Sequence, residues 1–153
     1  MPKVDRSKIP FTNNASYPKE FAPVIEGREK QKLGDAVGLT QFGVNVSRIK
    51  AHSKSALRHW HESEDEFIYV LQGEVVLETN DGEQVLRPGM CAGFPAGTGD
   101  AHRFVNRTAS DVTLLVIGDR TPDDEISYPD VDMHAVLAPD GVYRFSTKSG
   151  EPL

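Results

Sequence analysis

The sequence predicts an all-β fold, an antiparallel sandwich or barrel, and three observations support this. From Val37 onward, short apolar runs alternate with turn signals at close intervals. No long stretch has the 3.6-residue apolar spacing of an amphipathic helix. Ten prolines and thirteen glycines are typical of a chain with many turns. With 153 residues, the chain has the size of one domain with one sizeable core.

Residues 1–36 are expected to form an N-terminal arm. The first twenty residues are polar and are interrupted by three prolines. The segment 21–25, FAPVI, is a candidate edge strand, since Pro23 would interrupt a central ladder. Residues 26–32 are highly charged and predict a solvated loop or one helical turn.

The core of the predicted fold spans residues 37–118. Seven β-prone runs lie in this region, at 39–49, 66–71, 74–79, 84–86, 90–94, 102–106 and 112–117. Asn80-Asp81-Gly82, between two of these runs, predicts a hairpin turn. The pattern decays after Gly118. Residues 119–153 are expected to form a C-terminal tail over the barrel or a partner subunit, with a short strand at 143–145.

The charge distribution excludes some classes of partner. The net charge is -6 and the sequence pI is about 5.3. Lysines and arginines are scattered, which argues against nucleic acid and against an anionic membrane surface. The N-terminus lacks the apolar core of a signal peptide and no run of about 18 apolar residues exists, so we expect a cytoplasmic protein. The single cysteine, Cys91, is expected to be a buried structural thiol.

The segment 59–73, HWHESEDEFIYVLQG, combines residues that bind metals with a predicted strand. In a strand, residues i and i+2 face the same side, so His59 and His61 should point together. Glu66 follows His61 by five residues, an odd offset that would place it on the other face of one straight strand. We therefore expect a bend or bulge over 62–65, with Glu66 opening the next strand.

The strand that begins at Glu66 is apolar on both faces. Ile68 and Val70 share the interior face with Glu66. The opposite face carries Phe67, Tyr69 and Leu71. A second layer, from the N-terminal strands or another subunit, should cover that face. Together with the proline-rich ends of the chain, it leads us to expect a homodimer.

A fourth metal ligand has to come from elsewhere in the chain. His102 follows a turn-rich stretch and begins HRFVN, which places His102, Phe104 and Asn106 on one face of a strand. His52 lies in a polar loop and His134 in the C-terminal tail, and both are expected to be surface residues.

At this point the sequence resembles the cupin superfamily, in its small single-domain (monocupin) form. The first cupin motif is matched by His59-x-His61, four residues, Glu66, six residues and Gly73, although Ser53 stands where the leading glycine belongs. The second motif is matched by Gly89, five residues, Pro95-x-Gly97, then His102, three residues and Asn106. Four residues separate Gly97 from His102, two more than usual.

The resemblance implies a cupin-type (jelly-roll) β-barrel of two antiparallel sheets, with residues 1–153 as a single domain. It also implies that His59, His61, Glu66 and His102 bind one divalent transition metal ion. Three imidazoles and one carboxylate leave one or two open positions, a geometry that suits Fe, Mn, Ni, Co or Zn without distinguishing them.

The wall of the substrate pocket should come from interior neighbours of these ligands. The candidates are Ile68, Phe104 and Asn106. Arg48 is a further candidate that could pair with a carboxylate or phosphate, and Asn45 is an alternative, depending on the register of strand 39–49. Arg58 and Trp60 alternate away from His59 and are expected to pack or to lie at the surface.

An open metal position suits a small oxygenated metabolite. The leading hypothesis is a metal-dependent enzyme, either sugar-phosphate isomerase-like or dioxygenase-like, with no catalytic residue assigned. A phosphorylated sugar would require a cationic cluster, and the sequence shows no dense one. The alternatives are a small-ligand binding or sensing module, although residues 1–36 contain no helix-turn-helix pattern, and a barrel that the metal only braces.

Overall fold

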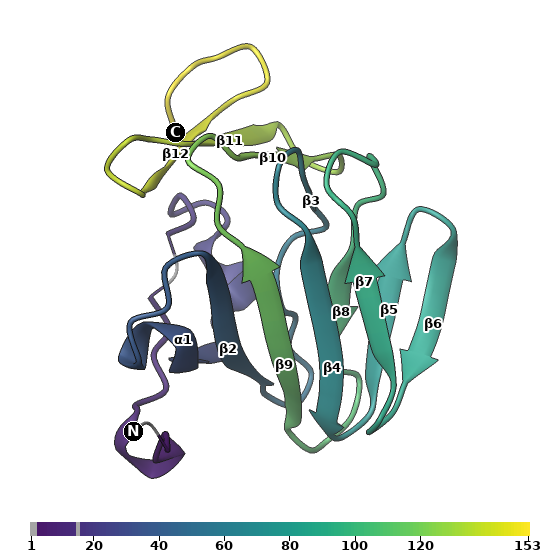
Figure 1. The fold of residues 1–153 in the computed structure, drawn as a ribbon. Coiled ribbons are helices and arrows are strands. Elements are labelled where there is room, and N and C mark those ends of the chain that lie inside the picture. Colours follow the sequence, from purple (N-terminus) through teal and green to yellow (C-terminus); the bar gives the residue numbers. More distant parts are fainter. Residues whose placement is uncertain (1–2, 15) are drawn as a thin grey trace.

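The computed structural model describes residues 3–14 and 16–153 of the chain. Within these residues the strands form three antiparallel sheets of five, four and three strands (Figure 1). The helices described there are short: two 3-10 helices and one α-helix, which are η1 (Arg6–Lys8), η2 (Ala22–Ile25) and α1 (Leu33–Ala36). None of the helices in these ranges is long and apolar enough to cross a membrane. The predicted all-β antiparallel fold is confirmed.

The five-stranded sheet is the largest and has the order β1-β2-β9-β4-β7. Its strands are β1 (Arg28–Lys32), β2 (Phe42–Ile49), β9 (Val112–Asp119), β4 (Glu66–Gln72) and β7 (Cys91–Phe94). Buried and exposed side chains alternate along β4 as predicted. Ile68 and Val70 are buried on the inner face, whereas Phe67, Tyr69 and Leu71 are 38–42% exposed on the outer face.

The three-stranded sheet, with the order β6-β5-β8, faces the large sheet across the main core. Its strands are β5 (Val75–Thr79), β6 (Gly82–Leu86) and β8 (Arg103–Val105). The predicted hairpin is confirmed, because β5 pairs with β6 in a register that ends at Thr79 opposite Gly82. The core between the two sheets is formed by aliphatic residues and Phe104.

Gly73 lies at the end of β4, at the position that the first motif reserves for glycine. Its φ is +82°, a left-handed conformation that side chains other than glycine rarely adopt. A Cβ at this position would lie 2.9 Å from the carbonyl oxygen of Asp111. Both the backbone conformation and the contact therefore require glycine, which allows the chain to turn from the large sheet into the small one.

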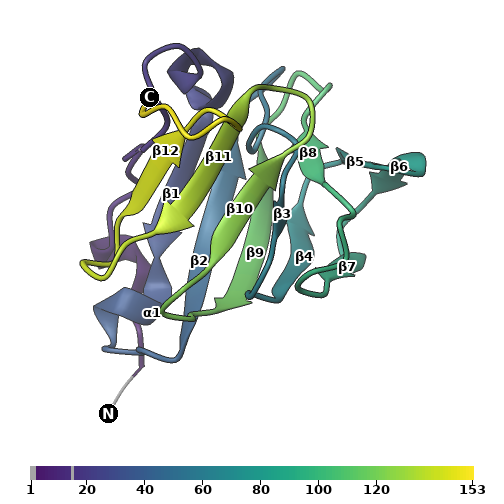
Figure 2. The ribbon, with the colours of Figure 1, turned by 90° about the horizontal axis from the view of Figure 1, so that it is seen from above.

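The four-stranded sheet has the order β12-β11-β10-β3 and lies across one end of the other two sheets (Figure 2). Its strands are β3 (Trp60–His61), β10 (Glu125–Tyr128), β11 (Met133–Leu137) and β12 (Tyr143–Ser146). Leu57, Ile126 and Met133 form a second core there, against which Tyr17 and Phe21 of the N-terminal arm pack. The expected short strand at 143–145 is present, but the sequence did not predict β10 and β11.

Two expectations for the N-terminal arm are wrong. The segment 21–25 is not an edge strand but contains η2, in which Pro23 lies in the first turn, a position where the missing N–H costs no hydrogen bond. Residues 26–32 are not a solvated loop, since they contain β1, which pairs with β2 from Arg28 opposite Ile49 to Lys32 opposite Asn45.

Cys91 also differs from the expectation. Its thiol is exposed rather than buried, because it lies on the outer face of β7, opposite Tyr69 on β4. The alternation of β7 directs Ala92 and Phe94 toward the core instead.

Candidate metal centre

The two histidines of the HxH pair lie where the four-stranded sheet meets the other two sheets. His61 belongs to β3, and His59 is joined to His102 by a pair of backbone hydrogen bonds of 3.1 and 2.9 Å. Glu66 is the first residue of β4. The acidic residues between His61 and Glu66 form the expected bend, which allows side chains at an odd spacing to face one interior.

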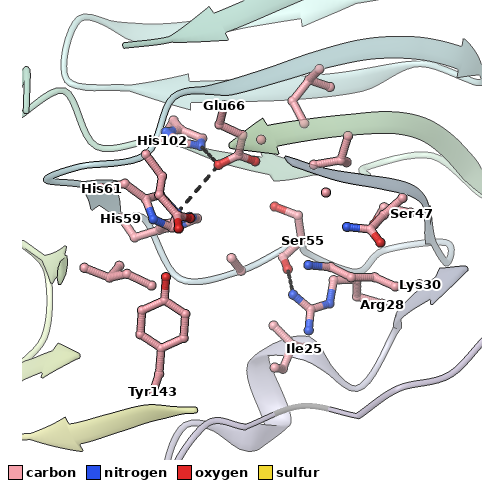
Figure 3. Close-up of a pocket in the computed structure, with 18 of the residues that line it drawn as sticks. Ile25, Arg28, Lys30, Ser47, Ser55, His59, His61, Glu66, His102 and Tyr143 are labelled. Carbon is pink, nitrogen blue, oxygen red and sulfur yellow. Dashed lines mark hydrogen bonds and ion pairs between the residues drawn. The ribbon is translucent and has the colours of Figure 1, made fainter. Parts of the chain in front are cut away.

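The four predicted ligands lie together around one point (Figure 3). His59, His61 and Glu66 each offer a ligand atom within 4.8 Å of the other two. Nε2 of His61 lies 3.8 Å from Oε2 of Glu66, and Nε2 of His102 lies 3.3 Å from the same oxygen. His102 therefore joins the cluster through Glu66.

Each imidazole is held in place by a neighbouring group. Nδ1 of His59 lies 2.8 Å from the carbonyl oxygen of Leu57, so it donates its proton there and leaves Nε2 unprotonated. Nδ1 of His61 lies 2.6 Å from Oδ2 of Asp124, which fixes the same tautomer. The ring of His102 stacks on Phe94, with ring centroids 3.5 Å apart and planes 6° from parallel.

Electrostatics favour an anionic carboxylate at Glu66 and a neutral imidazole at His59. Burial, followed by the neighbouring His102, lowers the pKa of His59 to about 3. Burial alone would raise the pKa of Glu66, but its hydrogen bond with His102 and the surrounding imidazoles outweigh it and hold that pKa well below its usual range. Burial would likewise lower the pKa of His61, but the hydrogen bond to Asp124 outweighs it and raises that pKa.

This donor set fits a divalent transition metal ion. Imidazole nitrogens and a carboxylate oxygen are suitable ligands for such ions, and histidine ligands usually donate their second N–H to a carboxylate or a carbonyl. His59 and His61 both have this second contact, to Leu57 and Asp124. The residues that would hold the metal are His59, His61, Glu66 and His102.

Asp124 is a site residue that the sequence did not reveal. Its side chain is 0% exposed and accepts hydrogen bonds from His61 at 2.6 Å, the hydroxyl of Tyr143 at 2.7 Å and the backbone N–H of Ser63 at 3.0 Å. These contacts outweigh burial, which would raise the pKa of Asp124, and lower it instead. In the sequence it lies in the acidic run TPDDE, where nothing separates it from its exposed neighbours.

The cluster opens into a pocket of about 450 Å³, within the range of small-molecule sites. Of the predicted wall residues, Ile68 and Phe104 line it, as does Asn45, the alternative to Arg48. The lining also includes Glu64, whose carboxylate lies within 4.8 Å of ligand atoms of His61 and Asp124.

Arg48 and Asn106 do not line the pocket, which corrects the expectation for both. Arg48 lies on the outer face of the large sheet, where it pairs with Glu29 and lies 3.9 Å above the ring of Phe11. The amide of Asn106 is turned into the loops and donates to the carbonyl oxygens of Ile49, Lys50 and Ser110.

The other residues considered from the sequence lie outside the cluster. His52 is exposed, with a φ of 59°, and His134 lies on β11, with Nε2 3.0 Å from a carboxylate oxygen of Glu125. Arg58 pairs with Asp130 at 2.9 Å, in agreement with a packing or surface role.

Comparisons with known proteins identify the class of this fold and site. A family model described as a cupin domain matches residues 45–118. A crystal structure described as a sugar phosphate isomerase of the cupin superfamily, from Silicibacter pomeroyi, is 43% identical, and the match covers 99% of this chain and 96% of that one with a TM-score of 0.95. The chain therefore belongs to the cupin superfamily, as a single-domain member.

More distant structures share the fold. A candidate sugar phosphate isomerase from Acidithiobacillus ferrooxidans is 29% identical over 82% of this chain and 80% of that one, with a TM-score of 0.74. A polyketide cyclase from Streptomyces resistomycificus is 24% identical over 78% and 79%, with a TM-score of 0.64. No curated protein matches the chain. Because one fold carries such different activities, the function has to be argued from the site.

Proposed function

We propose that this protein is a metal-dependent isomerase that moves a carbonyl group between neighbouring carbons of a small hydroxylated metabolite. The observation that carries the proposal is the His59, His61, Glu66 and His102 cluster, which opens into a pocket that also holds the carboxylate of Glu64. The 43% identical structure described as a sugar phosphate isomerase supports the same reaction class.

Isomerisation of this type needs a group that carries a proton between two carbons. The base removes the proton from the hydroxyl-bearing carbon and returns it to the former carbonyl carbon, while a second proton passes between the two oxygens, so that no oxidant is consumed. A divalent metal bound at the cluster would polarise the carbonyl and hydroxyl oxygens.

Glu64 is the candidate for the proton transfer. Its carboxylate is half-buried in the pocket and is held by the backbone N–H of Thr121 at 2.9 Å. Burial raises the pKa of Glu64 above the usual value for a glutamate, which brings it closer to the range in which a carboxylate exchanges protons efficiently.

The test uses protein loaded with each of the candidate metals and a panel of aldoses and ketoses, with and without phosphate groups. Turnover is followed by NMR as exchange of the transferred proton in heavy water. We expect His61→Ala and Glu66→Ala to abolish turnover, and Glu64→Gln to lower kcat by about 100- to 10,000-fold with unchanged metal content. Full activity in Glu64→Gln would exclude it as the base, and inactivity on the whole panel would contradict the isomerase proposal.

The bracing role of the metal makes a different prediction. If the metal only stabilises the barrel, a chelator should lower the melting temperature while no substrate of the panel is turned over. Under the isomerase proposal, the chelator should abolish turnover at temperatures where the protein is still folded. A dioxygenase would instead consume oxygen, which an oxygen electrode detects with the same panel.

We also propose a homodimer formed through the outer face of β4. Phe67, Tyr69 and Leu71 are each about two-fifths exposed on this face. Three large apolar side chains in alternate positions form the kind of exposed patch that marks a protein–protein contact.

A further inference from the structure

The first strand of the large sheet places basic residues inside the pocket. Arg28 and Lys30 are two residues apart on β1, so both point to the inner face, and both line the same pocket as His59 and Glu66 (Figure 3). The pairing of β1 with β2 sets Lys30 opposite Ser47, which also lines the pocket.

Neither of these basic side chains has a carboxylate partner among the residues that the structure describes. Arg28 donates one hydrogen bond, from a terminal nitrogen to the carbonyl oxygen of Ser55 at 3.2 Å, and its Nε is buried without a partner. The side chain of Lys30 makes no hydrogen bond or ion pair with any residue in 3–14 or 16–153. Glu29, between them, faces outward and pairs with Arg48 and Lys50.

Two other basic residues line the pocket, but each is either paired with a carboxylate or exposed to solvent. Arg120 lines the pocket but pairs with Asp35, and Lys32 is exposed to solvent. Among the described residues that line the pocket, the basic side chains that are partly buried and form no ion pair are therefore those of Arg28 and Lys30, which we call the β1 cation pair.

Two neighbouring like charges in a partly buried pocket are unfavourable when neither of them forms an ion pair. Burial, followed by the neighbouring Arg28, lowers the pKa of Lys30 to about 8. The chain has 23 acidic residues against 17 basic ones, so carboxylates are plentiful elsewhere. An uncompensated buried charge destabilises a fold, and such groups are found where a ligand provides the missing charge.

We propose that the β1 cation pair binds the phosphate group of a phosphate-monoester metabolite, while the hydroxyl and carbonyl oxygens of the same metabolite lie at the candidate metal site. This inference rests on the proposed function for the reacting end of the substrate. A phosphate monoester carries nearly two negative charges at neutral pH, which match the two cations. A carboxylate would neutralise only one of them.

Neutral donors beside the cation pair suit the remaining phosphate oxygens. Oγ of Ser55 accepts a hydrogen bond from the backbone N–H of Phe104 at 2.9 Å, so its own hydrogen is free to donate into the pocket. Ser47 and Asn45 line the same wall. The hydroxyls and the amide provide uncharged donors next to the guanidinium and ammonium groups.

The test measures binding rather than turnover, on chelator-treated protein. Glycerol 1-phosphate is titrated by calorimetry, with glycerate as a carboxylate probe of similar size and inorganic phosphate as the minimal probe. We expect one site for the monoester, and affinity about 10- to 100-fold lower in Lys30→Met and in Arg28→Met. Lys50→Met and Arg87→Met change the net charge equally outside the pocket and should stay within about twofold of the wild type.

Melting temperatures separate binding from a structural role. Removing an uncompensated charge should leave the melting temperature of Lys30→Met equal to or above that of the wild type, whereas a structural lysine would lower it. If Arg28→Met does not fold, Lys30→Met decides alone. Unchanged monoester affinity in Lys30→Met, or glycerate binding as tightly as the monoester, would overturn the proposal. Because no metal or turnover is involved, failure of the isomerase proposal leaves this result interpretable.

Discussion

At the level of single residues, Asp124 links the C-terminal region to the candidate metal site. A fully buried carboxylate is unfavourable unless its oxygens are hydrogen-bonded, and Asp124 accepts from His61, Tyr143 and Ser63. The contact with His61 keeps the proton on Nδ1 and leaves Nε2 facing Glu66. We therefore regard Asp124 as a positioning residue, which acts through His61.

Replacing Asp124 should weaken metal binding without removing a ligand. In Asp124→Asn the side chain keeps its shape, but its single acceptor oxygen cannot serve three donors. We expect metal affinity to fall by about 10- to 100-fold, measured by competition with a chromophoric chelator. Asp123→Asn, at the exposed neighbouring position, should bind metal like the wild type. Equal affinities in the two variants would show that His61 does not depend on Asp124.

Asn106 has a purely structural role at the same scale. Its amide nitrogen donates to three backbone carbonyls, and its oxygen accepts from the backbone N–H and the hydroxyl of Thr108. Asn106→Ala should lower the free energy of unfolding by about 3 kcal/mol, since several buried groups lose their partners. Urea unfolding measures this loss. Asn80→Ala, in the exposed β5–β6 turn, should cost about 1 kcal/mol or less, and an equally mild effect at Asn106 would contradict the assigned role.

At the level of elements, the sequence predicts the strands that contain runs of apolar residues bounded by turn signals. β4 was predictable because its apolar residues continue over several positions and end at a glycine. β1 was not, because its sequence REKQK is polar on both faces and shows no apolar alternation. The inner face of β1 is basic rather than apolar. These basic residues suggest a ligand-binding wall, and they are also the reason why the sequence did not predict a strand here.

The position of Lys30 on β1 should make phosphate binding depend on pH. Because burial and Arg28 lower the pKa of Lys30 to about 8, its ammonium group loses its proton as the pH rises through about 8. A phosphate monoester loses its second proton near pH ~6. Affinity for glycerol 1-phosphate should therefore be highest between about pH 6 and pH 8, and should fall above that range. Calorimetry at several pH values measures the profile.

The variant Lys30→Arg assigns the alkaline decrease. Arginine stays protonated in this range, so the decrease above about pH 8 should disappear. Glu66 stays ionised and His59 stays neutral around this pH, and burial raises the pKa values of Tyr17, Tyr128 and Tyr143. The pKa of His61, which burial would lower, is raised by its hydrogen bond to Asp124, but His61 is the same in both proteins, so only the part of the decrease that disappears is assigned to Lys30. An alkaline decrease that persists in Lys30→Arg would point to a different group.

At the level of the whole molecule, segments from both ends of the chain form part of the pocket wall. Tyr17 and Ile25 come from the N-terminal region, and Ile126, Tyr128 and Tyr143 come from the C-terminal sheet. The ring of Tyr17 packs edge-on against Tyr128, with centroids 5.9 Å apart. The motifs and the strand alternation predicted the ligands and two wall residues, Ile68 and Phe104. The part of the wall that comes from the terminal segments could not be predicted, because these segments are short, show no apolar periodicity and pack against one another.

The outer face of the large sheet allows a test of the proposed dimer. Phe67, Tyr69 and Leu71 are exposed there, and burying them against a second copy would remove apolar surface from water. We expect sedimentation velocity to show a dimer at micromolar concentration, and Phe67→Lys with Tyr69→Lys to give a folded monomer, since neither side chain contributes to the core. Val85→Lys, which changes an exposed residue on β6, should stay dimeric. A monomeric wild type would rule out the proposed interface, and a variant that stays dimeric would place the interface elsewhere.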